Sequence, residues 1–278
     1  MKHTEYEWKA VDGLSIFAQS WEEQDPPKAV ICLVHGLGEH SGRYAQVAES
    51  LNQGGYAVLA SDLRGHGKSE GKRGHSPSFT AFMDDMGILL AQAAQQYPDL
   101  PCFLWGHSLG GLLVANYVLR RRPELNGVVI TSPGFRTSIS DQKVKITFAK
   151  IAGKIMPEMN MLTGLDTKLI SRDPQVVEKY VNDPLVHGVA TLAMAKYTVE
   201  AIPWAYAHAS EWALPVLIMH GDADAVAYVS GSEEFARLIK EDCTLKIWPG
   251  LRHEIHNEPE KDQVLAYALG WLDSHLSL

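Results

Sequence analysis

The stretch CFLWGHSLGG, residues 102–111, decides the fold of this chain. It opens on apolar residues that predict a short buried strand, and residues 109–121 continue it with a helical pattern. The turn between them, Gly106-His107-Ser108-Leu109-Gly110, fits G-x-S-x-G, in which a serine occupies a strained strand-to-helix turn. Small residues two before and two after the serine let the two backbone segments pass closely. The stretch therefore predicts a nucleophilic serine, Ser108, at the end of a strand.

The rest of the chain repeats this alternation of short apolar runs and longer helical patterns. Residues 6–21 predict an added antiparallel pair that turns at Asp12-Gly13. The runs predict an α/β fold with a mostly parallel central sheet and helices on both faces. The expected strands are residues 29–34, 57–61, 102–105, 127–131, 216–219 and 244–248, and the expected helices are residues 43–54, 78–96, 109–121, 230–240 and 260–274.

Residues 136–212 break this rhythm, so we expect a core of residues 1–135 and 213–278 with a helical cap, or lid, inserted between them. The insertion is either an ordinary helical segment packed on the sheet or a lid over an active site. It leaves the sheet at the C-terminal end of a strand, where open α/β sheets bind ligands, and this favours a lid. Residues 143–156 predict a helix, and methionines cluster after it. Its expected apolar face consists of Val144, Phe148, Ile151 and Ile155.

Composition limits the partners of the chain. Its 278 residues carry a net charge of −8, which argues against a nucleic-acid partner. We see no signal peptide and no run long enough to span a membrane, so we expect a cytoplasmic protein. Cys32 and Cys102 lie in apolar runs and predict buried free thiols. We expect no cofactor and no metal, since residues 253–256 fall one residue short of the zinc motif H-E-x-x-H.

A nucleophilic serine needs a base and an orienting carboxylate, which follow in the order serine, acid, histidine in this type of fold. Asp224 comes after the strand 216–219, and His253 comes after the strand 244–248. Both therefore fall at the same sheet edge as Ser108. Asp222 and His256 are close rivals. We assign Asp222 to the turn, and we prefer His253 because it comes first after its strand.

An oxyanion hole completes the expected site, and one further carboxylate is expected to have only a structural role. The amides of Leu37 and Leu109 are the expected oxyanion hole, because Leu109 follows the serine and Leu37 lies in the glycine-containing loop after the strand 29–34. Asp62 precedes a tight loop, and we expect it to organise that loop.

Several stretches resemble the monoacylglycerol lipase family, also called lysophospholipase-like hydrolases, of the α/β-hydrolase fold. The similarity covers nearly the whole chain. It rests on HGLGEHSGRY (35–44), SDLRGHGKSEGKRG (61–74), GHSLGG (106–111), SRDPQVVEKYVNDPLVHG (171–188), HGDADAV (220–226) and LRHEIHNE (251–258). The resemblance implies Asp224 as acid and His253 as base.

The resemblance also implies a small lipid ester as substrate, cleaved to a fatty acid and glycerol. It places a glycerol headgroup pocket at Glu39, Arg43 and His256, although Glu39 and Arg43 could form only a helix-start ion pair. The alternatives are a lysophospholipase, a general carboxylesterase, a peptidase such as a proline iminopeptidase, and a non-catalytic binding protein. The apolar lid predicts transient contact with a membrane or micelle surface, or else core packing. The sequence does not fix the oligomeric state.

Overall fold

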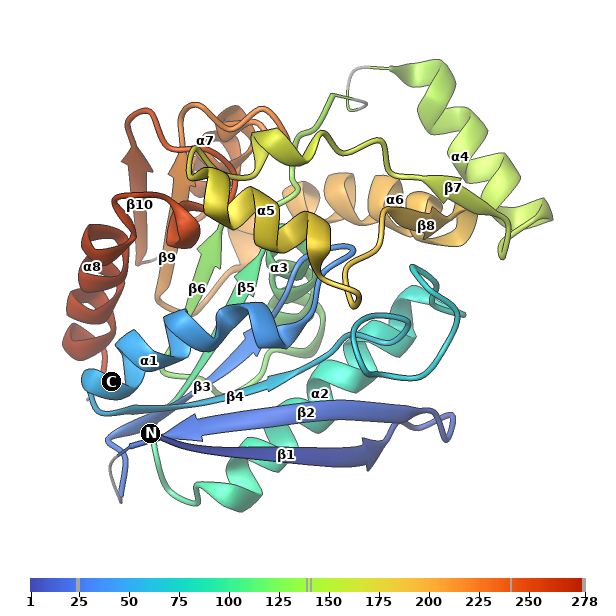
Figure 1. The fold of residues 1–278 in the computed structure, drawn as a ribbon. Helices are drawn as coiled ribbons and strands as arrows, with labels where there is room; N and C mark the ends of the chain where they lie inside the picture. The colour runs from blue at the N-terminus through green and yellow to red at the C-terminus, as the bar shows by residue number, and fades with distance from the viewer. Residues whose placement is uncertain (24–25, 139, 141, 241, 277–278) are drawn as a thin grey trace.

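An eight-stranded sheet runs through the centre of the chain in the order β1-β2-β4-β3-β5-β6-β9-β10 (Figure 1). The computed structural model describes residues 1–23, 26–138, 140, 142–240 and 242–276, except for the side chains of residues 143–145. The first two strands pair antiparallel with each other, and β2 pairs antiparallel with β4, whereas the remaining neighbours are parallel. The strands are β1 Lys2–Lys9, β2 Ser15–Glu22, β3 Ala29–Val34, β4 Tyr56–Ser61, β5 Cys102–His107, β6 Gly127–Thr131, β9 Val216–Gly221 and β10 Cys243–Trp248. The predicted mostly parallel sheet is confirmed.

Helices cover both faces of this sheet. Apolar side chains of α1 and α8 pack on one face, and those of α2, α3 and α7 pack on the other. The central parallel strands β3, β4 and β6 are buried along their whole length, as the uninterrupted apolar runs predicted. The helices are α1 Ala45–Gln53, preceded by the 3₁₀ turn Ser41–Tyr44, α2 Phe79–Gln96, α3 Leu109–Arg121, α7 Val229–Leu238 and α8 Lys261–Ser274.

The segment between β6 and β9, residues 136–212, contains helices and one short antiparallel pair of strands. Figure 1 shows α4 at the outer edge of the molecule beside α6, and α5 close to the ends of the parallel strands. We call residues 136–212 the inserted segment. Its elements are α4 Lys143–Ile155, β7 Asn160–Leu162, the 3₁₀ turn Thr167–Leu169, α5 Pro174–Asn182, β8 Val189–Thr191, α6 Leu192–His208 and the 3₁₀ turn Ala209–Glu211.

The predicted helix in this segment is confirmed as α4, but its apolar face does not pack on the sheet. Phe148, Ile151 and Ile155 are 65%, 55% and 73% exposed, while the side chain of Val144 lies outside the described residues. The reason is that α4 approaches α6 through Gly153, where an added Cβ atom would lie 2.6 Å from the Leu192 carbonyl oxygen. A small residue makes the close helix contact, and the large apolar residues face outward.

The cysteines match their prediction in part. Cys32, Cys102 and Cys243 are free thiols. Cys32 is buried as expected, but Cys102 is only half-buried because it is the first residue of β5, where the strand enters the sheet from the surface.

The predicted role of Asp62 as a loop organiser is confirmed. Its Oδ1 accepts hydrogen bonds from the backbone N–H and the hydroxyl of Ser41, at 2.8 and 2.5 Å, and its Oδ2 accepts one from the Lys68 N–H at 2.7 Å. The carboxylate therefore joins the loop after β4 to the 3₁₀ turn before α1.

Across the described part of the chain, no helix is both long enough and apolar enough to cross a membrane.

Gly110 should not tolerate a side chain. A Cβ atom there would lie 2.2 Å from the carbonyl oxygen of Val34 and 2.5 Å from that of His35, because α3 begins against the end of β3. We expect Gly110→Ala to lower the free energy of unfolding by about 1–3 kcal/mol, measured by urea denaturation. Gly270→Ala is the matched control. Gly270 is a helical glycine in α8 with open space around it, so alanine should stabilise the fold by about 0.5–1 kcal/mol. Equal midpoints for Gly110→Ala and the parent protein would contradict this account.

Candidate active site

Ser108 occupies the predicted strained turn between β5 and α3. Its backbone has φ 53° and ψ −116°, a conformation that residues with a side chain rarely adopt. The backbone can come this close because glycines stand two residues before and two residues after the serine: a Cβ atom on Gly106 would lie 2.5 Å from the Gly110 carbonyl oxygen. The Ser108 N–H donates to the Thr131 carbonyl at 3.0 Å, and its carbonyl accepts from the Gly134 N–H at 3.1 Å. The turn is therefore fixed on both sides.

A chain of hydrogen bonds runs from this serine through a histidine to a carboxylate. The Ser108 Oγ lies 2.9 Å from His253 Nε2, and His253 Nδ1 lies 2.7 Å from Asp224 Oδ2. The other carboxylate oxygen, Oδ1, accepts from the N–H groups of Val226 and Ala227 at 2.8 and 3.0 Å. The three residues predicted from separate strands therefore meet in the nucleophile–base–carboxylate order of covalent catalysis.

The same geometry separates these residues from their close rivals. Asp222 is exposed and accepts a hydrogen bond from the Gly250 N–H at 2.6 Å, so its predicted turn role is confirmed. His256 is buried, with its ring stacked on Tyr44 at 5.0 Å between centroids and edge-on to His107 at 4.8 Å. Among the described residues the Nδ1 atom of His256 has no hydrogen-bond partner, and burial lowers the pKa of His256 to about 4.

His220 also belongs to this site, although the sequence predicted no role for it. It is the second-last residue of β9 and fully buried. Its Nε2 lies 3.0 Å from Asp224 Oδ2 and 2.9 Å from the Ala227 carbonyl oxygen, while its Nδ1 lies 2.7 Å from the Ser232 hydroxyl. Since a carbonyl can only accept, Nε2 carries the proton and donates to Asp224. The motif His220-Gly-Asp-Ala-Asp contained this signal, but the contact depends on the fold of the turn.

Burial and charge act in opposite directions on the acid and the base. Burial by itself raises the pKa of Asp224, but the His253 charge and the hydrogen bonds from His220 and His253 outweigh it, so the pKa lies below its usual range. Burial by itself lowers the pKa of His253, but the charge of Asp224 and its hydrogen bond raise that pKa above the ordinary histidine value. Asp224 therefore stays ionised and favours a protonated His253.

The loop expected to supply an oxyanion-hole amide lies directly against the serine. A Cβ atom on Gly36, the residue before Leu37, would lie 3.3 Å from Ser108 Cβ. His35 fixes this loop: its Nε2 accepts from the Leu63 N–H at 2.8 Å, so its Nδ1 is the protonated nitrogen and donates to the Gly36 carbonyl at 2.8 Å. Leu109 is the first residue of α3, where helical N–H groups have no partner within the helix. The two predicted amides thus lie on the two segments that border Ser108.

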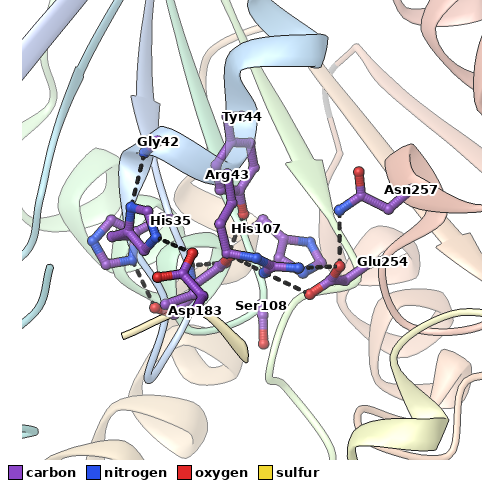
Figure 2. Close-up of polar contacts among 12 residues, drawn as sticks. His35, Gly42, Arg43, Tyr44, His107, Ser108, Asp183, Glu254 and Asn257 are labelled. Carbon is purple, nitrogen blue, oxygen red and sulfur yellow. Dashed lines mark hydrogen bonds and ion pairs between the residues drawn. The ribbon is translucent and has the colours of Figure 1, made fainter. Parts of the chain in front are cut away.

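A buried cluster of charged residues adjoins the serine (Figure 2). Arg43 forms an ion pair with Glu39 Oε2, and its Nη1 and Nη2 donate to the two oxygens of Glu254 at 2.8 and 2.7 Å. The side chains of Glu39, Arg43 and Glu254 are only 4%, 10% and 4% exposed. Tyr180 of α5 covers Arg43, with the guanidinium 4.6 Å from its ring centroid. We call Glu39, Arg43 and Glu254 the charged cluster.

The predicted pair Glu39 and Arg43 is thus brought together, and His256 adjoins it through Tyr44. The Tyr44 hydroxyl donates to Glu39 Oε1 at 2.7 Å, and the same oxygen accepts from the Gly36 N–H at 2.7 Å. Glu254 was not predicted. Its position beside His253 in the sequence was visible, but its contact with Arg43, 211 positions away in the chain, depends on the fold.

Comparisons with known proteins agree with this fold and site. The family described as "Serine aminopeptidase, S33" matches residues 25–260. A monoacylglycerol lipase of Mycolicibacterium smegmatis is 36% identical over 275 residues, which are 98% of this chain and 98% of that protein. A phospholipase of Bacillus subtilis is 31% identical over 91% of this chain and 98% of its own length. The crystal structure of a Paleococcus ferrophilus monoacylglycerol lipase superposes with a TM-score of 0.84 at 33% identity, covering 99% of this chain and all of that one.

The sheet, the strained serine turn and the hydrogen-bonded serine, histidine and aspartate define an α/β-hydrolase with the arrangement of a serine hydrolase. The chain belongs to the monoacylglycerol lipase family of these hydrolases. The resemblance found in the sequence is therefore confirmed.

The pH dependence of ester cleavage should follow the protonation of His253. A protonated imidazole cannot accept the serine proton, so kcat/KM should rise with pH and reach half its maximum above about pH 6.5, the ordinary histidine value. Asp224→Asn should lower kcat by about 10⁴-fold and shift this midpoint to lower pH. Both effects are measured with a soluble p-nitrophenyl ester. Asp222→Asn is the matched control and should leave the midpoint unchanged; an equal shift in both variants would contradict the assignment of Asp224.

Proposed function

We propose that this protein hydrolyses the ester bond of monoacylglycerols to a fatty acid and glycerol through an acyl-enzyme on Ser108. The observation that carries the proposal is the hydrogen-bonded series Ser108, His253 and Asp224 beside a buried polar cluster. The series supplies the nucleophile and base for ester cleavage, and the cluster supplies polar groups for a small headgroup. A bacterial relative named monoacylglycerol lipase and a human relative named monoglyceride lipase add support.

The chemistry follows from the positions of these groups. The Ser108 oxygen attacks the ester carbonyl while His253 Nε2 takes the serine proton, and the amides of Leu37 and Leu109 stabilise the negative oxygen of the tetrahedral intermediate. His253 then gives its proton to the departing glycerol oxygen. Water attacks the acyl-enzyme in the second step, with His253 again taking a proton, and the fatty acid leaves. Asp224 stays ionised and stabilises the protonated His253.

For the two ends of the substrate we propose separate binding regions. Glu39, Arg43 and His256 would bind the glycerol hydroxyls. The acyl chain would enter a mostly apolar cavity of about 450 Å³ between α4 and α6. Phe135 lines this cavity and directly follows Gly134, whose N–H donates a hydrogen bond to the Ser108 carbonyl. The other apolar lining residues include Ile146, Val199, Ile202 and Pro203. The inserted segment would in this way act as the lid predicted from the sequence.

We further propose that the inserted segment touches a membrane or micelle surface to collect substrate. Its outer side carries several large exposed apolar residues, and the surfaces of soluble proteins seldom expose so many of them. These residues are Phe148, Ile151, Ile155, Met156, Met159, Met161 and Leu162.

Ser108→Ala should abolish turnover without unfolding the protein. We expect kcat for 1-monooleoylglycerol and for p-nitrophenyl butyrate to fall by at least about 10³-fold, because the nucleophile is gone while the surrounding amides remain. A fluorophosphonate probe should label the parent protein and not the variant. Substantial p-nitrophenyl ester cleavage by Ser108→Ala would remove Ser108 from the mechanism. Cleavage of aminoacyl amides but not of monoacylglycerol by the parent would instead favour a peptidase.

The double variant Phe148→Ser with Ile155→Ser should separate surface contact from chemistry. We expect weaker binding to phosphatidylcholine vesicles in sedimentation and lower activity on vesicle-borne monooleoylglycerol, because less apolar area enters the lipid. The kcat/KM for soluble p-nitrophenyl butyrate and the urea midpoint should stay unchanged, since both side chains face solvent. Unchanged vesicle binding, or a loss of stability instead, would contradict the surface role.

A further inference from the structure

The charged cluster holds two carboxylates against one guanidinium. Glu39 and Glu254 both pair with Arg43, and Asn257 Nδ2 adds a hydrogen bond to Glu254 at 2.8 Å. Burial alone raises the pKa of Glu254, but the adjacent Arg43 charge and its hydrogen bonds hold that pKa below the usual range. Two carboxylates and one guanidinium give the cluster a formal net charge of −1. A net charge in a buried region acts strongly on nearby ions because little water screens it.

This negative charge lies within reach of a substrate headgroup. A Cβ atom on Gly36 would meet both Glu39 Oε1, at 2.8 Å, and Ser108 Cβ, at 3.3 Å, so the carboxylate and the nucleophile border the same small space. Glu254 directly follows the catalytic base candidate His253 in the chain. Any group attached to the scissile ester by a short linker, such as a glycerol unit, is therefore close to these carboxylates.

The guanidinium N–H groups with which an arginine would bind phosphate are already occupied in Arg43. A free guanidinium fork presents two parallel N–H groups that match phosphate oxygens. Here Glu254 already occupies that fork through both of its oxygens, at 2.8 and 2.7 Å, and Glu39 accepts from Nη1 as well. Tyr180 covers a face of the guanidinium. An arriving phosphate would have to displace Glu254 or lie beside two carboxylates.

We propose that Glu254 determines headgroup specificity: it occupies Arg43 and makes the pocket net negative, so that uncharged diol headgroups are accepted and phosphate-bearing headgroups are rejected. The proposal rests on the proposed function, because it specifies which glycerol esters that site accepts. Hydroxyl groups can donate to Glu39 or Glu254 as well as accept, whereas a phosphate dianion only accepts. Like charges that are brought close together in a buried site repel strongly. We therefore expect the site to prefer the neutral headgroup over the phosphate-bearing one by at least about 100-fold.

The test compares two substrates that differ only in the headgroup. They are 1-octanoylglycerol and 1-octanoylglycerol 3-phosphate, used below their micelle concentrations so that surface effects do not enter. The parent protein should show a kcat/KM at least about 100-fold higher for the neutral ester. Glu254→Gln removes one charge with little change in shape, and it should narrow this ratio by at least about 10-fold. Parent ratios within about threefold of unity, or an unchanged ratio in the folded variant, would overturn the proposal.

Two further variants separate charge selection from a structural role. Glu254→Asp keeps the charge while shortening the side chain, so it should retain the preference for the neutral ester even if both rates fall. Glu233→Gln removes the same amount of charge at an exposed position of α7, outside the charged cluster, and should leave both rates unchanged. If Glu254→Gln and Glu254→Asp lower both rates by the same factor, Glu254 acts only as a structural partner of Arg43.

A competition experiment on the parent protein keeps the proposal testable if Glu254→Gln does not fold. Glycerol should inhibit p-nitrophenyl butyrate cleavage at lower concentration than glycerol 3-phosphate by at least about 10-fold. Equal inhibition by the two compounds would overturn the charge selection. Failure of the proposed function gives a different result: the parent would cleave p-nitrophenyl butyrate but not 1-octanoylglycerol.

Discussion

The strained backbone of Ser108 is the constraint on which the rest of the site depends. A residue with a side chain is held at φ 53° only because β5 and α3 approach each other through Gly106 and Gly110. The turn directs the serine hydroxyl out of the sheet edge. The parallel register of β5, β6, β9 and β10 then brings the ends of β9 and β10 to the same edge, and the loops after them carry Asp224 and His253. The hydrogen bonds between these residues follow from where the strands end.

Buried charge is the second organising feature, and it is compensated in two different ways. Asp224 accepts hydrogen bonds from His253, His220 and two backbone N–H groups, and no arginine or lysine among the described residues pairs with it. The charged cluster instead uses ion pairs around Arg43. Buried ions are tolerated only when such partners are present, since desolvation is costly. Both arrangements raise the pKa of His253, with Asp224 as the larger influence and Glu254 and Glu39 adding to it.

Much of the fold and the candidate site could be predicted from the sequence because the signals are local. The apolar runs gave β3 and β6 at their observed bounds, and the order of strands and turns located Ser108, Asp224 and His253 at one edge. The features that were missed all depend on tertiary contacts. The pairing of Glu254 with Arg43 joins distant loops, and the donation from His220 to Asp224 needs the observed turn. The direction of the apolar face of α4 depends on a close helix contact at Gly153, which periodicity alone does not reveal.

The inserted segment is joined to the loop after β3 by a direct backbone contact. The His187 N–H donates to the Gly38 carbonyl at 2.8 Å, and a Cβ atom on Gly38 would lie 2.4 Å from the His187 carbonyl oxygen. The φ of Gly38 is +78°, so a glycine suits this position for both its backbone and its close neighbour. Gly38 directly follows Leu37, and Tyr180 of the same inserted segment covers Arg43. A displacement of residues 180–188 would therefore change the surroundings of the Leu37 amide and of the charged cluster together. A movement of the exposed apolar residues of the inserted segment that also displaces residues 180–188 would therefore change the position of the groups that border Ser108.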